Sequence, residues 1–266
     1  MLAGHGKSGV NHSVLSVFFR DERGNVRNQL RDLYSKRIRG FREKSFIDVH
    51  SPSTTFVPMS HEPIWVGWGR ELQAIAQTGL HFSESEYDLG RYRKILEISI
   101  EIFANYSGES PASIRGLFEN QTGYATPKVD VRGVVFRDDK LLMVQERSDG
   151  LWTLPGGWAD VNDSPSEAVE REIVEESGFR TKAERMIAVF DRAKHGNVPP
   201  FPFHVYKLFI LCRLLGGEAK TSTETTGVEF VSENEIPPLS LSRNTREQIQ
   251  FCFDSRKNPD NPCRFD

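Results

Sequence analysis

One helix near the middle of the chain has both ends marked by the sequence, and it constrains the fold more than any other segment. Ser164 is a suitable N-cap, Pro165 fits the first helical position, and Glu167 completes a Ser-x-x-Glu capping box. Gly178 stands where a helix ends, because glycine adopts the left-handed conformation of a C-terminal cap without strain. The sequence therefore predicts an α-helix over residues 165–177.

Three glutamates of this predicted helix lie on one face. Glu172, Glu175 and Glu176 stand at positions i, i+3 and i+4, so at about 100° per residue they fall within an arc of about 100°. Like charges at this spacing destabilise a helix by roughly 0.2–0.5 kcal/mol per pair, and folding does not require them. Either the face is an acidic surface turned to solvent, or it holds a divalent cation that reverses the sign of the electrostatic interaction.

The residues around the helix favour the cation. Arg171 stands next to the acidic group and can brace one carboxylate, and the turn Pro155-Gly156-Gly157 can bring backbone carbonyls to the same point. Glycine permits that approach because it has no Cβ. Charged and neutral oxygens together suit Mg²⁺ or Mn²⁺, which keep water ligands and readily bind phosphate oxygens. We therefore expect a phosphorylated ligand.

The whole segment resembles the Nudix box, Gly-x5-Glu-x7-Arg-Glu-U-x-Glu-Glu-x-Gly-U, in which U is aliphatic or bulky. Here the pattern begins at Gly157 and ends with the run from Arg171 to Phe179, which reads REIVEESGF. The one departure is Asp163, which stands where the box has Glu. Because the familiar metal-binding acids of the box are the later ones, this departure concerns the bracing of the loop more than metal binding.

The resemblance implies a fold, an activity and a set of residue roles. The fold is an α+β Nudix fold, a mixed sheet sandwiched by helices, and the activity is hydrolysis of a nucleoside diphosphate linked to another moiety. Residue by residue, the resemblance implies metal contacts from Glu172, Glu175 and Glu176, a contact from the Gly156 carbonyl, and bracing by Arg171. Within the box, Glu172 is the candidate catalytic base, with Arg171 beside it.

The resemblance extends beyond the box. The segments at 68–80, 124–133 and 235–243 look like a bacterial Nudix subgroup that carries its own helical N-terminal domain, so that about residues 62–266 are covered. Members of that subgroup are described as ADP-ribose or CDP-choline pyrophosphatases, and the extra domain is associated with dimer formation. The resemblance thus implies a homodimer that acts on a small nucleoside diphosphate.

The hydrophobic pattern divides the chain at the same places. Between residues 62 and 120, apolar residues recur at three- and four-residue steps, which predicts a small all-α domain of two longer helices and a shorter one at 112–120. Gly79 and Gly108 stand where the longer helices would end. From 126 to 266 the period is mostly two, and we predict strands at 129–136, 141–145, 151–154, 186–190 and 203–211, with a further helix at 245–254. This order indicates an α+β domain rather than a doubly wound parallel sheet.

Residues 1–60 differ from the remainder in charge. They carry ten Lys or Arg and five Asp or Glu, so their net charge is +5, whereas the whole chain has −3 and the remaining residues −8. They show no sustained helical or alternating period, and we interpret them as a basic, flexible extension. Such a tail can bind nucleic acid or direct a protein to an organelle, but a plain solvated extension is the interpretation we favour.

Composition limits the location of the protein. No segment approaches the ~18 consecutive apolar residues of a membrane span, and the first twenty residues lack the order of a secretory signal. Cys212, Cys252 and Cys263 show no Cys-x-x-Cys spacing, so neither a disulfide framework nor a zinc site is indicated. We expect a cytoplasmic protein that makes no membrane contact.

Specificity for the base and the terminal group must come from loops, because the cation contacts only phosphate. Trp158, beside the double glycine, either stacks on a ring of the substrate or fills space between loop and core. Three residues near 191–196 either touch phosphate or a sugar hydroxyl or belong to an ordinary strand connection: Arg192, Lys194 and His195. Nudix enzymes also place the base on a late loop, so two further acids are alternatives to Glu172 unless they belong to a polar hairpin: Glu218 and Glu224.

These features favour a Mg²⁺- or Mn²⁺-dependent pyrophosphohydrolase that cleaves ADP-ribose to AMP and ribose 5-phosphate. CDP-choline and an RNA-linked diphosphate are alternative substrates for the same chemistry. A nucleotide-binding regulator on the same scaffold is an alternative of another class, although it would not need all three box glutamates. A homodimeric protein that binds RNA through residues 1–60 is the remaining alternative.

Overall fold

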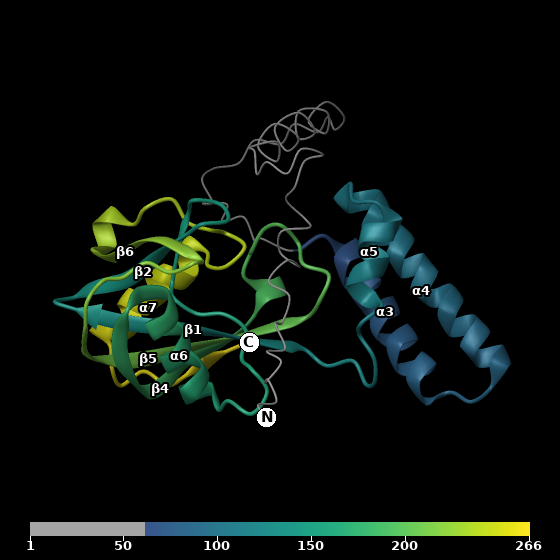
Figure 1. The fold of residues 1–266 in the computed structure, drawn as a ribbon, viewed down its shortest axis with the longest axis horizontal. Helices are drawn as coiled ribbons and strands as arrows, with labels where there is room; N and C mark the ends of the chain where they lie inside the picture. The colour runs from purple at the N-terminus through teal and green to yellow at the C-terminus, as the bar shows by residue number, and fades with distance from the viewer. Residues whose placement is uncertain (1–61) are drawn as a thin grey trace, which may run out of the picture. The chain divides into compact units, whose positions relative to one another are not determined.

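The computed structural model describes residues 62–266, and the basic extension expected at 1–60 lies outside that range. The described residues form three helices followed by a mixed sheet with one helix on each face (Figure 1). This is the α+β architecture expected from the sequence. None of the helices described between residues 62 and 266 is long and apolar enough to cross a membrane. The three cysteines are free thiols.

The helical region consists of α3 (Ile64–Phe82), α4 (Glu86–Ser107) and α5 (Pro111–Phe118). Serine N-caps begin α4 and α5, and Gly108 ends α4 in the left-handed conformation with φ of 81°. Helices α3 and α4 approach closely at Gly69, whose carbonyl accepts a hydrogen bond of 2.8 Å from the buried Ser99 hydroxyl. The predicted helices are therefore confirmed.

The predicted end of the first helix at Gly79 is wrong. Helix α3 continues to Phe82, and the absence of a side chain at Gly79 makes room for a neighbouring ring. A Cβ at this position would lie 2.4 Å from the ring of Tyr92 on α4. The glycine thus allows two helices to pack closely, a tertiary reason that sequence periodicity does not reveal.

The sheet contains seven strands. Six of them follow the order β3-β2-β1-β5-β4-β7, and β6 pairs with β2. Strands β1 and β5 are parallel, as are β4 and β7, whereas the other pairs are antiparallel. The strand bounds are β1 Lys128–Arg137, β2 Lys140–Glu146, β3 Trp152–Thr153, β4 Phe179–Asp191, β5 Val205–Gly217, β6 Thr225–Val231 and β7 Arg264–Phe265.

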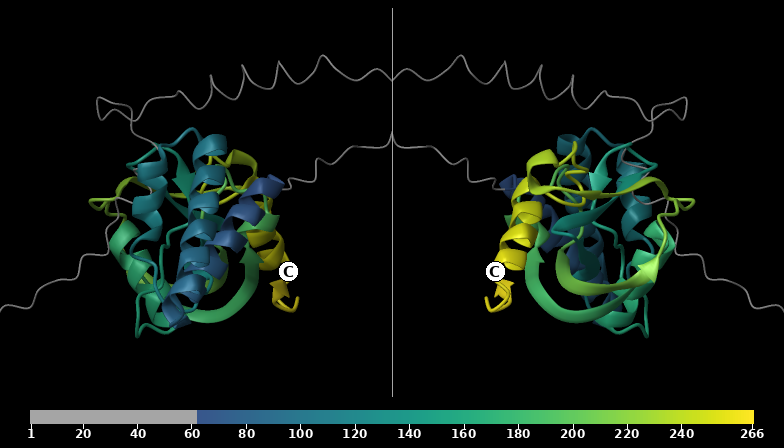
Figure 2. Two further views of the ribbon diagram at one scale, coloured as in Figure 1. Left: turned by 90° about the vertical axis from the view of Figure 1, so that its right-hand side faces the viewer. Right: turned by 90° about the vertical axis from the view of Figure 1, so that its left-hand side faces the viewer.

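Two helices cover the two faces of this sheet (Figures 1 and 2). Helix α6 (Pro165–Ser177) buries Ala168, Val169 and Ile173 in one core, and α7 (Arg246–Lys257) buries apolar residues in the other. Alternate residues of β1 point to the two cores, as the two-residue strand period requires. The expected sheet sandwiched by helices is confirmed.

Two strands escaped prediction. Strand β6 carries Thr225, Thr226 and Glu229 among its seven residues and is only partly buried, so it has no regular apolar alternation. Strand β7 is two residues long and exposed. Strands β4 and β5 are also longer than predicted: the first half of β4 carries alternating polar residues, and its backbone pairs with the second half of β5, which ends in two glycines.

The close contact at Gly69 generates a stability prediction with an internal control. A Cβ at Gly69 would lie 2.7 Å from the ring of Phe103, which is only 3% exposed, whereas a Cβ at Gly67 would meet nothing within 4 Å. We expect Gly67→Ala to stabilise α3 by about 1 kcal/mol through helix propensity. We expect Gly69→Ala to destabilise the fold by about 1–3 kcal/mol through overpacking. Urea unfolding of both variants measures the difference, and equal stability of the two would contradict the packing.

Candidate functional site

The acidic helix and the glycine loop are joined by a hydrogen bond. Glu176, which is 5% exposed, accepts a bond of 2.9 Å from the backbone N–H of Gly156. Gly156 has φ of 141°, and a Cβ there would lie 2.0 Å from the carbonyl oxygen of Val131. The loop therefore lies directly on β1, a position that only glycine permits.

Backbone hydrogen bonds also hold the loop on β1. The carbonyls of Pro155 and Gly157 accept from Gly133 and Val131, each at 2.8 Å. The carbonyl of Gly156, between them, accepts no hydrogen bond from any residue in the range 62–266. Of the three carbonyls, this is the one that we expect from the sequence to face a cation.

The other two glutamates differ in burial. The Glu172 side chain is 14% exposed, and its carboxylate lies within 3.0 Å of where a Cβ of Gly157 would stand. The Glu175 side chain is 60% exposed. Both carboxylates interact with Arg171, whose Nη1 lies 2.8 Å from Glu172 and 3.4 Å from Glu175. The three acids therefore share a helix face, but Glu172 and Glu176 lie toward the loop while Glu175 lies toward solvent.

Arg171 also contacts the loop that precedes the helix. Its Nε donates to Asp163 at 3.1 Å, and its Nη2 lies 3.3 Å from Asp160. Asp163 is the residue that departs from the box pattern. The shorter carboxylate still reaches the arginine, so the connection between loop and helix is retained.

A further buried acid, Glu146 at the end of β2, is marked by no motif in the sequence. It is 5% exposed and pairs with Arg243 at 2.8 Å. Burial raises the pKa of Glu146 against the opposing effect of Arg243 and Arg132. Burial also raises the pKa of Glu176 well above its ordinary value, with a second contribution from the charge of Glu146. Burial likewise raises the pKa of Glu172, with Arg171 opposing.

A buried ionic cluster under the loop was also missed. Asp130 accepts from Arg132 at 2.8 and 2.6 Å and from Lys207 at 3.0 Å, and all three are 5% exposed or less. Burial lowers the pKa of Lys207 to about 7. Arg132 lies close enough to Glu176 and Glu146 to feel both charges. The sequence does contain a signal for this cluster, because Asp130 and Arg132 are two charged residues on one face of the otherwise apolar strand β1.

The late loop, residues 218–224 between β5 and β6, lies at the C-terminal end of α6. Lys220 donates its N–H to the Ser177 carbonyl at 2.9 Å, and the Thr225 hydroxyl donates to the Glu176 carbonyl at 2.8 Å. Of the two predicted acids, Glu224 lies close enough to raise the pKa of Glu146. Glu218 lies beside Gly178, where a Cβ would stand 2.5 Å from its carbonyl oxygen. Both glutamates are exposed.

The predicted substrate residues have different surroundings. Trp158 is half-buried and stacks on Phe201 with centroids 6.2 Å apart. Arg192 is buried and donates to the Pro199 carbonyl at 2.8 Å. His195 is buried and pairs with Asp266 at 3.0 Å. Lys194 is exposed. The contacts of Arg192 and His195 hold their loop in place, and Lys194 and Trp158 offer accessible surface.

The donor set fits a divalent cation. Within residues 62–266, no three acidic, histidine or cysteine side chains already surround a common point at metal-binding distance. However, buried Glu176 and half-buried Glu172 of one helix have raised pKa values, mainly because burial removes hydration from the charged carboxylates, and a cation that replaced this hydration would stabilise their charged form. The free Gly156 carbonyl and the space left by Gly157 lie beside them. Hard oxygen donors of this kind suit Mg²⁺ or Mn²⁺.

Fold and site together define a Nudix domain, and comparison with known proteins agrees. Residues 126–252 match the family described as NUDIX domain, and residues 63–118 match one described as UDP-X-like, N-terminal oligomerisation domain. The protein YjhB of Bacillus subtilis is 44% identical over 76% of this chain and 97% of its own length. YjhB is named as a proposed ADP-ribose pyrophosphatase. The chain belongs to the Nudix hydrolase family and is a hydrolase of nucleoside diphosphate-linked substrates.

Two further relatives are informative. An ADP-ribose pyrophosphatase of Methanocaldococcus jannaschii is 31% identical over 44% of this chain and 69% of its own. A UDP-X diphosphatase of known crystal structure is 30% identical to this chain in sequence. The two structures align with a TM-score of 0.50, over 76% of this chain and 98% of the other. The similarity to that structure therefore includes the helical region as well as the Nudix domain.

The position of the glycine loop generates a second stability prediction. Gly156→Ala introduces a Cβ against a backbone carbonyl that cannot move, so we expect a loss of at least about 3 kcal/mol in the free energy of unfolding. Gly108→Ala also has positive φ but open space around it, and we expect a loss of about 1–2 kcal/mol. Chemical denaturation measures both losses. Similar values for the two would show that the loop does not press on β1.

Proposed function

We propose that the protein is a Mg²⁺-dependent pyrophosphohydrolase that cleaves ADP-ribose into AMP and ribose 5-phosphate. The observation that carries this proposal is the pair of glutamates, half-buried Glu172 and buried Glu176, held against the glycine loop of a Nudix box. The similarity to YjhB and to the archaeal ADP-ribose pyrophosphatase supports the choice of substrate.

We assign the metal contacts to Glu172, Glu175, Glu176 and the carbonyl of Gly156. A bound divalent cation would neutralise charge on the two phosphates and lower the pKa of a coordinated water. The chain itself orients these groups: the Gly156 N–H fixes Glu176, and Arg171 holds Glu172 and Glu175. Because the helix, the loop and β1 are joined by hydrogen bonds, the donors are positioned before substrate binds.

We assign the proton acceptor for the attacking water to Glu172. Its partly buried carboxylate faces the glycine loop, and burial raises its pKa, which favours proton uptake. Glu224 is the alternative, since its charge reaches buried Glu146 from the late loop. Exposed Lys194 and half-buried Trp158 lie on loops that can contact the phosphate, sugar or base of the substrate.

The proposed activity is tested by product analysis. Purified protein with Mg²⁺ or Mn²⁺ is incubated with ADP-ribose, CDP-choline, a UDP-linked sugar and a short RNA with a 5′-diphosphate linkage. We expect AMP and ribose 5-phosphate from ADP-ribose at the highest kcat/KM, and no products in the presence of EDTA. If the protein instead prefers a UDP-linked compound, the proposed substrate is wrong and the activity is that of the UDP-X diphosphatase whose structure it resembles.

Substitution of the box tests the residue roles. Glu176→Gln keeps the shape of the side chain but removes its charge, so we expect kcat to fall by at least about a hundredfold with the fold intact. Glu170→Gln on the same helix is the matched control, because its carboxylate contacts Lys182 and the Ala183 N–H instead of the loop. We expect it to remain active within about threefold. Full activity of Glu176→Gln would remove this residue from the site.

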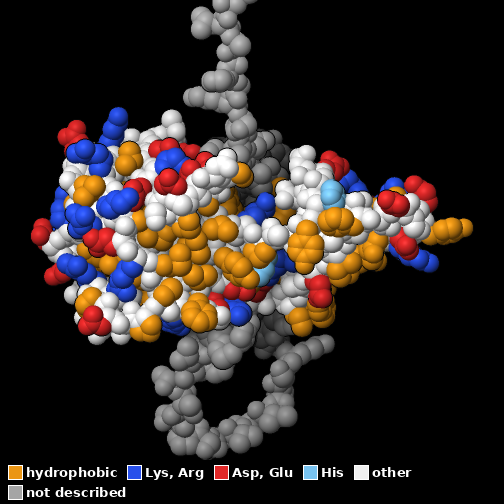
Figure 3. Space-filling model, turned by 90° about the horizontal axis from the view of Figure 1, so that it is seen from below, with side chains coloured by type: hydrophobic (Ala, Val, Ile, Leu, Met, Phe, Trp, Pro, Cys, Tyr) orange, Lys and Arg blue, Asp and Glu red, His pale blue; other side chains and the backbone are white. Residues whose placement is uncertain are grey.

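We also propose that residues 62–120 form a homodimerisation domain and residues 126–266 the catalytic domain. Helix α3 exposes an apolar stripe at spacings of four and seven residues, and these side chains are 45–69% exposed: Ile64, Trp68, Ile75 and Phe82. Figure 3 shows apolar side chains along the helices at the right of its view. The match to an oligomerisation domain over residues 63–118 supports a second copy as the partner.

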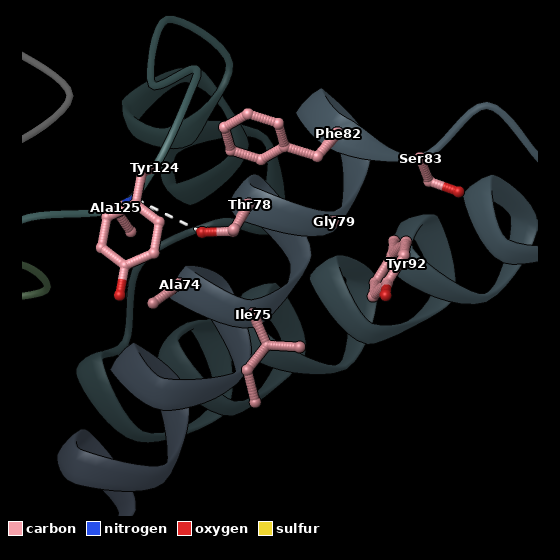
Figure 4. A pocket seen from close by; sticks show the side chains of 9 residues that line it. All are labelled: Ala74, Ile75, Thr78, Gly79, Phe82, Ser83, Tyr92, Tyr124 and Ala125. Atoms are coloured by element: carbon pink, nitrogen blue, oxygen red, sulfur yellow. Dashed lines mark hydrogen bonds between the residues drawn. The ribbon is translucent and has the colours of Figure 1, made fainter.

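A groove of about 640 Å³ lies beside this stripe. Ile75, Phe82 and Tyr124 surround it, and a hydrogen bond of 3.3 Å from the Ala125 N–H to the Thr78 hydroxyl closes one side (Figure 4). An apolar groove next to exposed apolar side chains is typical of a surface that is covered in an assembly. We therefore place the dimer contact on this side of α3.

Light scattering tests the assembly. We expect a dimer for the wild type and a monomer for Trp68→Glu, because a charge in the centre of an apolar interface has no partner there. Val161→Glu is the matched control: Val161 is 90% exposed and lies in the loop before α6, so this variant should remain dimeric. A monomeric wild type, or a dimeric Trp68→Glu, would contradict the proposed interface.

A further inference from the structure

A continuous series of aromatic rings joins the helical region to the glycine loop. Neighbouring ring centroids are 5.7–6.2 Å apart, within the range over which aromatic side chains attract each other. We call this series the aromatic chain. Its rings follow in the order Trp65, Phe103, Phe118, Phe203, Phe201 and Trp158.

The helical end of the aromatic chain is tightly packed. Phe103 and Phe118 are each 3% exposed, and Phe103 lies against Gly69 so closely that no Cβ would fit between them. Phe118 is the last residue of α5, and its ring meets Phe203 edge-on at 5.7 Å. The position of the Phe203 ring is therefore set by the packing of the helices.

The middle of the aromatic chain is held by two cations. The Lys128 ammonium lies 4.8 Å from the centroid of Phe203, and the Arg192 guanidinium lies 5.3 Å from that of Phe201. Arg192 also donates to the Pro199 carbonyl of the same loop at 2.8 Å. Cations over aromatic faces add attraction to the packing, so the two phenylalanines form a fixed support.

At Trp158 the backbone and the side chain are held by different neighbours. The backbone is paired with β1, through a bridge to Asp130 and a bond of 3.0 Å from the Ala159 N–H to the Val129 carbonyl. The indole instead stacks on Phe201 at an interplanar angle of 28°, and it is half-buried. Removing the support would therefore reorient the indole without moving the loop that carries Gly156 and Gly157.

We propose that the helical region takes part in substrate binding, because Phe118 and Phe203 are positioning residues that hold the Trp158 indole as a stacking surface for the nucleobase of the substrate. This deepens the proposed function and rests on it. A partly accessible indole with a rigid support binds a planar base with little loss of side-chain entropy. The glutamates of α6 are held separately, by Gly156 and Arg171, so the support affects binding and not the chemical step.

Steady-state kinetics test this role. We expect Phe203→Leu and Phe118→Leu each to raise KM for ADP-ribose about threefold to tenfold, with kcat within about twofold of the wild type. In a Trp158→Ala background, Phe203→Leu should change KM by less than about twofold, because the ring that it supports is gone. Phe251→Leu is the matched control, a half-buried phenylalanine that meets Phe190 outside the aromatic chain, and it should leave KM unchanged.

An equal effect of Phe203→Leu with and without Trp158 would overturn the proposal, as would a fall in kcat alone. A second measurement needs no turnover. The difference in fluorescence between each protein and its Trp158→Phe counterpart isolates the emission of Trp158, and we expect this emission to shift to the red and to be quenched more by acrylamide in Phe203→Leu and Phe118→Leu. Unchanged Trp158 emission in both variants would overturn the coupling. Absence of any diphosphate hydrolysis by the wild type would instead overturn the proposed function, and the emission would still decide whether the helices support Trp158.

Discussion

The hydrogen bond from the Gly156 N–H to the Glu176 carboxylate is the interaction on which the candidate site depends. It connects the last turn of α6 to the loop that follows β3, and the loop itself lies on β1 because Gly156 brings no Cβ against Val131. Strand β1 in turn pairs with β5 along eight residues. The carboxylate is thus fixed by the helix, the loop and the sheet together, and none of these elements alone would place it.

Burial of the Glu176 carboxylate costs free energy because the charged group loses its hydration. Charged residues in the interior offset part of this cost. Arg132 lies near Glu176 and Glu146 while it pairs with Asp130, and Arg243 pairs with Glu146 from the late part of the chain. Buried charges of this kind contribute little net stability as pairs, but the removal of one partner leaves another unpaired, at a cost of about 3–5 kcal/mol. The network therefore restricts which substitutions the site tolerates, and a divalent cation would give the carboxylate a further favourable interaction in place of its lost hydration.

The sequence predicts features that local interactions determine. Helix α6 is an example, because its N-cap, its capping box and its C-terminal glycine all lie within fifteen residues and form the bonds expected of them. The three glutamates on one face were equally accessible to this reasoning. The different burial of these glutamates could not be predicted, because it depends on where the glycine loop lies. Glu175 and Glu176 are neighbours on the helix, yet only Glu176 is buried.

Features that depend on distant residues escaped prediction. The pair of Glu146 and Arg243 joins the end of β2 to the segment before α7, and no local pattern links them. Gly79 was interpreted as a helix end, although it serves the contact of α3 with Tyr92. The aromatic chain is a similar case: Phe118 and Phe203 lie far apart in sequence, and each alone reads as an ordinary apolar residue.

The net charge of the described region limits how an anionic substrate can be bound. Outside residues 1–60 the chain carries −8, which repels a diphosphate, although salt screens this repulsion beyond about 8 Å at physiological ionic strength. Binding must therefore be decided at short range, by groups that do not depend on the overall charge. A divalent cation at the box glutamates is one such group, and a neutral stacking surface is another, because dispersion and burial of apolar area are insensitive to the sign of the surrounding charge. In the role proposed for Trp158, a rigid, half-buried indole would therefore help an acidic protein more than a basic one, and the helical region would supply that rigidity through Phe118.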